Sequence, residues 1–149
     1  MDSANEQEAM RVLLISSDEA DITIVKEVLS ESNFLRELYV VRDGEESLDF
    51  LFKHKNYIDV PTPDLILLDL DLPNKNAREV LKEIKHDDIL RLIPVVVLAT
   101  SNSQYDINEC YSLHANSYII KPVDLDNFNE TIRKIEEFWF TCSSLPSYN

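Results

Sequence analysis

The sequence predicts a parallel, doubly wound α/β sandwich, in which helices cover both faces of a five-stranded sheet. Two observations predict it. Short apolar runs alternate five times with longer segments of helical periodicity, and LILLDLDLP, residues 65–73, indicates a strand that is apolar on both faces and broken only by Asp69 and Asp71. A strand of that kind belongs in the middle of a parallel sheet. The 149 residues suit one such domain, which needs no disulfide or metal to fold.

Five apolar runs are expected to form the strands. Each is short and rich in Val, Ile or Leu, as buried strands are. The runs occupy residues 12–15, 38–41, 95–98 and 118–120, and the third is the Leu and Ile run that opens LILLDLDLP at residues 65–73.

The segments between the strands have apolar residues at helical spacing. The first helix is expected to begin with Ser17 or Asp18 as its N-cap. The second is expected to end at the two prolines of residues 59–63. The last helix is expected to bury four residues spaced by four, three and four: Phe128, Ile132, Ile135 and Trp139.

Composition excludes several kinds of partner. Twenty-eight acidic against fourteen basic residues give a net charge of −14, and no cluster of Lys or Arg is present, so direct binding to nucleic acid is not expected. No apolar run reaches the roughly 20 residues that span a bilayer. Cys110 and Cys142 have no CxxC spacing and no secretory leader precedes the first strand, which favours a cytoplasmic protein with reduced thiols.

Sheets of this kind also host nucleotide-binding and hydrolytic proteins. A phosphate-cradling loop needs glycines, and the chain has one, Gly44, which lies on the wrong side of the second strand for such a loop. No GxSxG motif or zinc signature is present either. An NTPase, a dehydrogenase or a hydrolase is therefore not expected.

Polar residues gather in the loops that follow the expected strands. In a parallel sheet these loops meet at one edge, where ligands bind. Asp69 and Asp71 follow the third strand, Thr100 the fourth and Lys121 the fifth. A site is therefore expected at this edge, with Asp69 at its centre.

Four stretches carry a family resemblance: DLDLP, the turn Arg-Asp-Gly, PVVVLATS and the late Lys-Pro. Over residues from about 11 to 140 the chain resembles the receiver domain of two-component response regulators, and in particular the stand-alone receivers that partner cyanobacterial phytochromes. The resemblance implies a flavodoxin-like (βα)5 fold with strand order 2-1-3-4-5. It divides the chain into an N-terminal tail (1–10), the receiver (11–140) and a C-terminal tail (141–149), with no effector domain.

The resemblance also implies a chemistry. Asp69 would accept a phosphoryl group from a histidine kinase or a phosphotransfer protein, and Lys121 would neutralise charge on that group. Mg²⁺ would bind Asp69, the backbone carbonyl of Asp71 and the acidic-ligand position that Ser17 occupies here. Pro122 suggests the family's cis peptide bond after Lys121. The protein would not be an enzyme beyond transferring the phosphoryl group to itself.

The chain departs from the family pattern at three positions. Ser16 and Ser17 replace an acidic pair, and hydroxyls are poorer Mg²⁺ ligands than carboxylates. The strand-four hydroxyl of the family falls at Ala99, and Thr100 beside it should face the other way. Tyr118 matches the family's switch aromatic, with simple packing as the alternative. We therefore expect impaired phosphorylation and weak Mg²⁺ binding; the alternative is a phosphorylation-independent pseudo-receiver that acts as a dimeric adaptor.

Three consecutive aromatic residues near the C-terminus favour an interface. Phe138, Trp139 and Phe140 cannot all face one core, because successive helical residues point about 100° apart. Exposed aromatic surface is typical of interfaces. A homodimer is expected through these residues and the tail Leu145-Pro146, unless the tail folds back and covers them.

Overall fold

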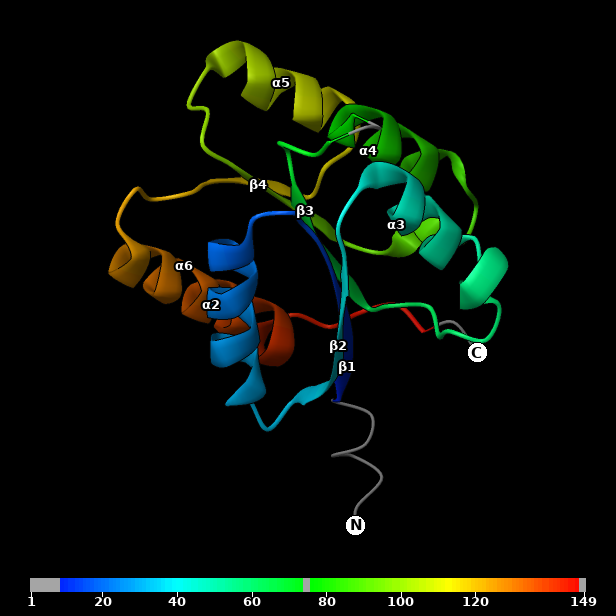
Figure 1. Ribbon diagram of the computed structural model, residues 1–149, viewed down its shortest axis with the longest axis horizontal. Helices are drawn as coiled ribbons and strands as arrows, with labels where there is room; N and C mark the ends of the chain where they lie inside the picture. The colour runs from blue at the N-terminus through cyan, green and yellow to red at the C-terminus, as the bar shows by residue number, and fades with distance from the viewer. Residues whose placement is uncertain (1–8, 74–75, 148–149) are drawn as a thin grey trace.

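The computed structural model describes residues 9–73 and 76–147, in which strand and helix alternate five times (Figure 1). The strands are β1 (Met10–Ile15), β2 (Leu35–Val41), β3 (Leu65–Asp69), β4 (Val95–Ala99) and β5 (Ser117–Ile120). The helices are α2 (Glu19–Ser30), α3 (Gly44–Leu51), α4 (Ala77–His86), α5 (Gln104–Ser112) and α6 (Leu125–Glu137). Shorter turns are η1 (Lys55–Tyr57), η2 (Leu90–Leu92) and a π-helical η3 (Phe138–Cys142).

The sheet confirms the predicted topology. All strand pairs are parallel, and the order is β2-β1-β3-β4-β5. From β1 the chain passes to β2 on one side, and the later strands β3, β4 and β5 are added on the other side of β1. The strand order therefore reverses between β1 and β3. The carboxyl ends of these two strands are where ligands of such sheets bind.

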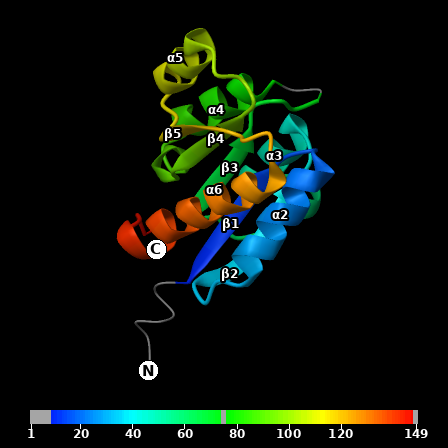
Figure 2. The same cartoon turned by 90° about the vertical axis from the view of Figure 1, so that its left-hand side faces the viewer.

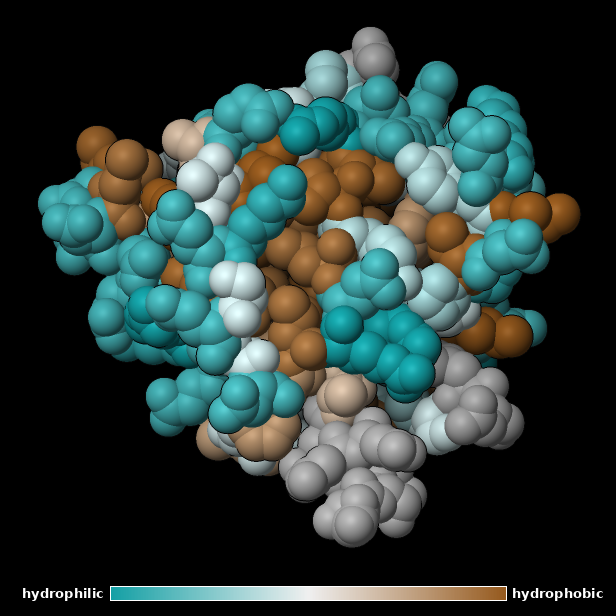
Figure 3. Space-filling model, turned by 60° about the horizontal axis from the view of Figure 1, so that its bottom comes forward, coloured by the Kyte–Doolittle hydropathy of each residue, from teal (hydrophilic) through white to brown (hydrophobic). Residues whose placement is uncertain are grey.

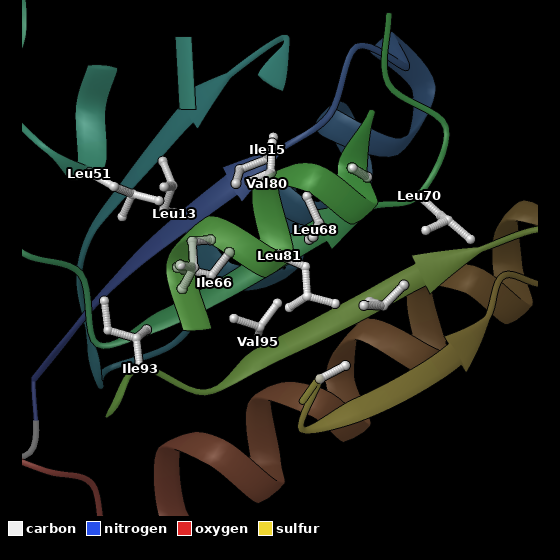
Figure 4. Packing of buried hydrophobic residues seen from close by; sticks show 14 of the residues in the cluster. Leu13, Ile15, Leu51, Ile66, Leu68, Leu70, Val80, Leu81, Ile93 and Val95 are labelled. Atoms are coloured by element: carbon white, nitrogen blue, oxygen red, sulfur yellow. The ribbon is translucent and has the colours of Figure 1, made fainter. Parts of the chain in front are cut away.

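Alternation along the strands divides the core into two layers, because successive side chains point to opposite faces. On one face, Leu13 and Ile15 pack with residues of α3, α4 and α5 (Figure 4). On the other, Val12 and Leu14 pack with residues of α2 and α6. Figure 2 shows α2 and α6 side by side on their face of the sheet. The sandwich is therefore three layers deep, as predicted.

Asp and Asn side chains start the helices. Asp18 is the N-cap of α2, so of the two predicted candidates the aspartate caps the helix, and its carboxylate accepts the backbone N–H of Asp21 at 3.1 Å. Asp43, Asn76 and Asp124 cap α3, α4 and α6 in the same way. Each cap satisfies a backbone N–H that has no partner inside its helix.

The prolines do not end the second helix, so that prediction is wrong. α3 ends at Leu51, well before Pro61 and Pro63. Lys53 lies in the left-handed region with φ of 60°, which stops the helix before the prolines are reached. The turn η1 then fills the space up to the prolines.

The end of the last helix also differs from the expectation. Phe128, Ile132 and Ile135 are buried as predicted, but Trp139 is only partly buried and Phe140 is 6% exposed. The backbone N–H of Ser143 reaches the carbonyl of Phe138 at 2.9 Å, a π-type bond that spans five residues. The wider turn brings Phe140, five residues after Ile135, onto the buried stripe.

The described residues include no helix that is both long and apolar enough to cross a membrane. A groove of about 1030 Å³ opens at the edge of the sheet opposite Asp69, where β1 begins. Arg11, Phe34, Trp139 and the segment 143–147 line it. Figure 3 turns the underside of the molecule forward and shows a strip of hydrophobic surface between hydrophilic residues. This groove is remote from the polar loops that follow the strands.

Lys85 ties the end of α4 to the start of β4. Its ammonium donates to the carbonyls of Arg91 and Ile93 and to Oδ1 of Asn116, at 2.9 to 3.0 Å. We expect Lys85→Met to lower the free energy of unfolding by about 1–3 kcal/mol, because these acceptors lose their donor. Urea denaturation measures the change. Lys82→Met, at an exposed position of the same helix, is the control and should change it by less than about 0.5 kcal/mol.

The same lysine gives a pH dependence. Burial lowers the pKa of Lys85 to about 8 from the ordinary 10.5. Between these values the unfolded chain binds more protons than the folded one, so stability due to Lys85 rises with pH. The difference in stability between wild type and Lys85→Met should therefore grow from about pH 7.5 to about pH 9.5. A difference that shrinks over this range would contradict the assignment.

Candidate functional site

Three strands end at one polar site. Asp69 is the last residue of β3 and is 3% exposed, Ser16 follows β1 directly, and Lys121 follows β5 directly. Leu14 and Leu67 are register partners whose side chains share the face under α2 and α6. Two residues further on, the same alternation brings Ser16 and Asp69 together.

The carboxylate of Asp69 has three hydrogen-bond donors. Oδ2 accepts the hydroxyl of Ser16 at 3.1 Å and the ammonium of Lys121 at 3.0 Å. Oδ1 accepts the backbone N–H of Asp71 at 3.0 Å. The structure thus joins Asp69 and Lys121, as the sequence predicts, although the two residues lie far apart in the chain.

A second carboxylate in the site was not predicted. The ammonium of Lys121 also donates to Oδ2 of Asp21 at 2.8 Å. Asp21 lies on the first turn of α2, three residues after the N-cap Asp18, and this helix covers the face from which Asp69 and Lys121 project. Its place near the start of the first helix was the available signal, since that helix start meets the same edge of the sheet.

Burial and charge act in opposite directions on the ionisable groups. Burial raises the pKa of Asp69, although the N–H of Asp71, the Lys121 ammonium and the Ser16 hydroxyl oppose that rise. Burial alone would lower the pKa of Lys121, but Asp21 and Asp69 raise it overall. The pKa of Lys121 rises despite burial because the ammonium has two carboxylate partners. Asp69 has one ammonium partner, which it shares with Asp21, and burial dominates its pKa.

The donor set fits a divalent cation poorly. Asp69 is the one carboxylate at the predicted metal position, and one of its oxygens already accepts two hydrogen bonds. Ser17 is exposed, and in the described part of the chain it is Ser16 whose hydroxyl contacts Asp69. Residues 9–73 and 76–147 contain no group of three His, Cys, Asp or Glu residues able to hold a metal. Mg²⁺ prefers carboxylates to hydroxyls.

The predicted switch residues lie on both sides of β4. Ala99, the last residue of β4, is buried under α4 and α5, whereas Thr100 follows the strand and is exposed. The hydroxyl of Thr100 lies 3.5 Å from Oδ2 of Asp71, at the limit of a hydrogen bond. Tyr118 is half-buried and its hydroxyl donates to the carbonyl of Ser101 at 2.8 Å. Its ring therefore packs beside the loop after β4.

The peptide bond after Lys121 is trans. None of the described residues has a cis peptide bond, so the cis bond suggested by Pro122 is wrong. The trans form is the more stable one by about 0.5–1 kcal/mol for a bond that precedes proline.

The fold is that of an α/β domain with a buried aspartate at the end of the central strand and a lysine after the last one. The family model described as "Response regulator receiver domain" matches residues 12–133. The chain belongs to that family and is a receiver domain of two-component signalling. Receiver domains are signalling proteins rather than classical enzymes.

Relatives with known names cover most of the chain. Response regulator Rcp1 of Synechocystis sp. is 43% identical over 136 residues, which are 91% of this chain and 92% of Rcp1. The probable methanogenesis regulatory protein FilR2 of Methanothrix harundinacea is 36% identical over 135 residues, which are 91% of this chain and 86% of FilR2.

Solved structures agree in fold. The phosphorylated cyanobacterial phytochrome response regulator RcpA is 44% identical, with a TM-score of 0.91 over 93% of this chain and 99% of RcpA. The Mn²⁺-bound form of Rcp1 is 42% identical, with a TM-score of 0.90 over the same shares. These two structures represent a phosphorylated and a metal-bound receiver with the backbone described above.

Proposed function

We propose that this receiver accepts a phosphoryl group on Asp69 from a histidine kinase or a phosphotransfer protein, of the phytochrome type. The buried contact between Asp69 and Lys121 carries the proposal. The Asp69 carboxylate, the proposed nucleophile, lies 3.0 Å from the Lys121 ammonium at the edge of the sheet, which supports the proposal. The relatives named for phytochrome signalling support this choice of partner. Two free cysteines, Cys110 and Cys142, suit a cytoplasmic site of action.

The proposed step needs no proton transfer. An oxygen of the Asp69 carboxylate forms a bond to phosphorus, and the bond from phosphorus to the donor breaks with its electron pair on the donor. The product is an acyl phosphate whose negative charge lies on the phosphoryl oxygens. The Lys121 ammonium neutralises part of that charge, which is how proteins assist phosphoryl transfer.

Mg²⁺ is proposed as a weakly bound cofactor. Asp69, the backbone carbonyl of Asp71 and the hydroxyl of Ser17 would hold it. When bound, the ion would neutralise charge on the phosphoryl oxygens. The support for weak binding is the donor set, since two hydroxyls stand where the family has two carboxylates. We therefore propose that phosphorylation is slow compared with receivers that keep the acidic pair.

A direct test is intact mass after incubation with acetyl phosphate and Mg²⁺. We expect a partial phosphoryl adduct on the wild type and none on Asp69→Asn. A receiver with the full acidic pair, labelled in parallel, should react faster. Adduct on both variants would contradict the assignment of Asp69, and no adduct on a folded wild type would contradict phosphorylation.

One observation favours the alternative of a phosphorylation-independent pseudo-receiver. The Asp69 carboxylate is already satisfied by three donors from its own chain. Such a site could serve to hold the loops in place while the surface binds partners. Failure of both acetyl phosphate and kinase donors would favour this function.

Homodimerisation is proposed through the C-terminal aromatics. Phe138 is 52% exposed, and its ring meets Trp139 edge-on at a centroid distance of 4.9 Å. Phe140 is buried within its own chain, so the contact predicted for it is unsupported and the proposed surface consists of Phe138 and Trp139. Leu145 packs partly against the core, and the tail 141–149 would thus support the interface rather than form it.

We expect Phe138→Ser to shift the protein from dimer to monomer in sedimentation at micromolar concentration. The reason is that an exposed aromatic at the centre of an interface carries much of its binding free energy. Tyr105→Ser is the matched control, because Tyr105 is 73% exposed on α5, on another element. A wild type that sediments only as a monomer would contradict the proposal.

A further inference from the structure

The Lys121 ammonium lies between two carboxylates, not one. Its distances are 2.8 Å to Oδ2 of Asp21 and 3.0 Å to Oδ2 of Asp69. The side chains of Lys121, Asp21 and Asp69 are 8%, 16% and 4% exposed, so water screens this cluster little. Two of the three ammonium hydrogens therefore have carboxylate acceptors, one on Asp21 and one on Asp69.

The two carboxylates have different fates in the proposed reaction. When Asp69 is phosphorylated, its carboxylate loses its charge and the new charge lies farther out, on the phosphoryl oxygens. Asp21 is not a reactant, and it is held on the first turn of α2, where Asp18 caps its backbone N–H. The contact of Lys121 with Asp21 is therefore the one that the reaction leaves unchanged.

From this geometry we infer that Asp21 is a positioning residue, which holds the ammonium of Lys121 at the phosphoryl site before and after Asp69 reacts. The inference rests on the proposed phosphorylation of Asp69. Asp21 supplies the pocket with a carboxylate from α2. The loop after β1 supplies none, because Ser16 and Ser17 replace the acidic pair there. Asp21 acts through Lys121 and does not touch the phosphoryl group.

The chain offers a matched set of variants. Asp21→Ala removes the anchor, and Asp21→Glu keeps the charge on a longer side chain. Glu27→Ala removes an equal charge from an exposed position on the same helix. Circular dichroism and urea denaturation show whether each variant is folded.

The first readout is the rate of adduct formation as a function of acetyl phosphate concentration. Asp21→Ala should lower the maximal rate about tenfold or more, equivalent to about 1.4 kcal/mol, with a smaller change in the half-saturating concentration. Asp21→Glu should recover most of the rate, and Glu27→Ala should match the wild type. A folded Asp21→Ala with wild-type rates would overturn the inference.

The second readout does not depend on phosphorylation. In protein labelled with ¹⁵N-lysine, an ammonium held by two buried carboxylates exchanges its hydrogens slowly and gives an NMR signal. We expect the Lys121 signal, assigned with Lys121→Met, in the wild type and in Asp21→Glu, and its loss in Asp21→Ala. Its persistence in Asp21→Ala would overturn the positioning role. If the wild type gains no phosphoryl group, the proposed function fails, and this readout still decides whether Asp21 holds the lysine.

Discussion

Lys121→Met is expected to lower the free energy of unfolding by about 3–5 kcal/mol at pH 8, because two buried carboxylates lose their shared cation. The contacts of Lys121 with Asp21 and Asp69, at 2.8 and 3.0 Å, are the basis. The loss should be smaller at about pH 5, since carboxylates without a cation can take up protons there. Urea denaturation at both pH values measures it.

Lys134→Met is the control for this prediction. Lys134 lies exposed on α6, and its removal should change stability by less than about 0.5 kcal/mol. The Lys121→Met variant should also fail to gain a phosphoryl adduct, whatever its stability. Equal stabilities for Lys121→Met and Lys134→Met would mean that the buried cluster does not form.

Restoring a carboxylate at the metal position is expected to have the other large effect. Ser17→Asp places an acid at an exposed position in the loop after β1, and we expect about a tenfold faster gain of the phosphoryl adduct in the presence of Mg²⁺. The physical reason is that Mg²⁺ binds carboxylates in preference to hydroxyls. Time courses of intact mass at several Mg²⁺ concentrations measure it, and the Mg²⁺ needed for half the maximal rate should fall.

The matched control adds the same charge far from the site. Ser144→Asp lies in the exposed C-terminal segment, beside the groove at the opposite edge of the sheet, and should leave the rate unchanged. If neither Ser17→Asp nor Ser144→Asp changes the rate, the loss of the acidic pair does not limit phosphorylation. If both accelerate it, net charge rather than metal binding is responsible.

The fold was predictable because the strands are short apolar runs, whereas the helices are longer segments with apolar residues at helical spacing. The Leu and Ile run that opens residues 65–73 indicated a strand buried on both faces, and β3 forms there but ends at Asp69. The end of α3 was mistaken because Lys53, not a proline, takes the left-handed conformation that stops the helix. A lysine in the sequence does not predict such a conformation, because the conformation depends on the packing of the following turn.

The site was predictable where strand geometry decided it. Asp69 ends β3 and Lys121 follows β5, so their place at one edge of the sheet could be deduced from the strands. Alternation along β1 could also have selected Ser16 over Ser17 as the neighbour of Asp69. The contact of Asp21 with Lys121 depends instead on how α2 docks on the sheet, and the burial of Phe140 depends on a π-helical turn. The place of Asp21 near the start of the first helix indicated its closeness to the site, but neither property can be deduced from the local sequence alone.

The most direct test of the central claim is to locate the phosphoryl group in the chain. After reaction with a histidine kinase or acetyl phosphate, borohydride reduces an aspartyl phosphate to homoserine, which peptide mass spectrometry can place. We expect homoserine at position 69 of the wild type, and no homoserine in Asp69→Asn. Homoserine at another aspartate, or none in a protein that carries the phosphoryl mass, would contradict it.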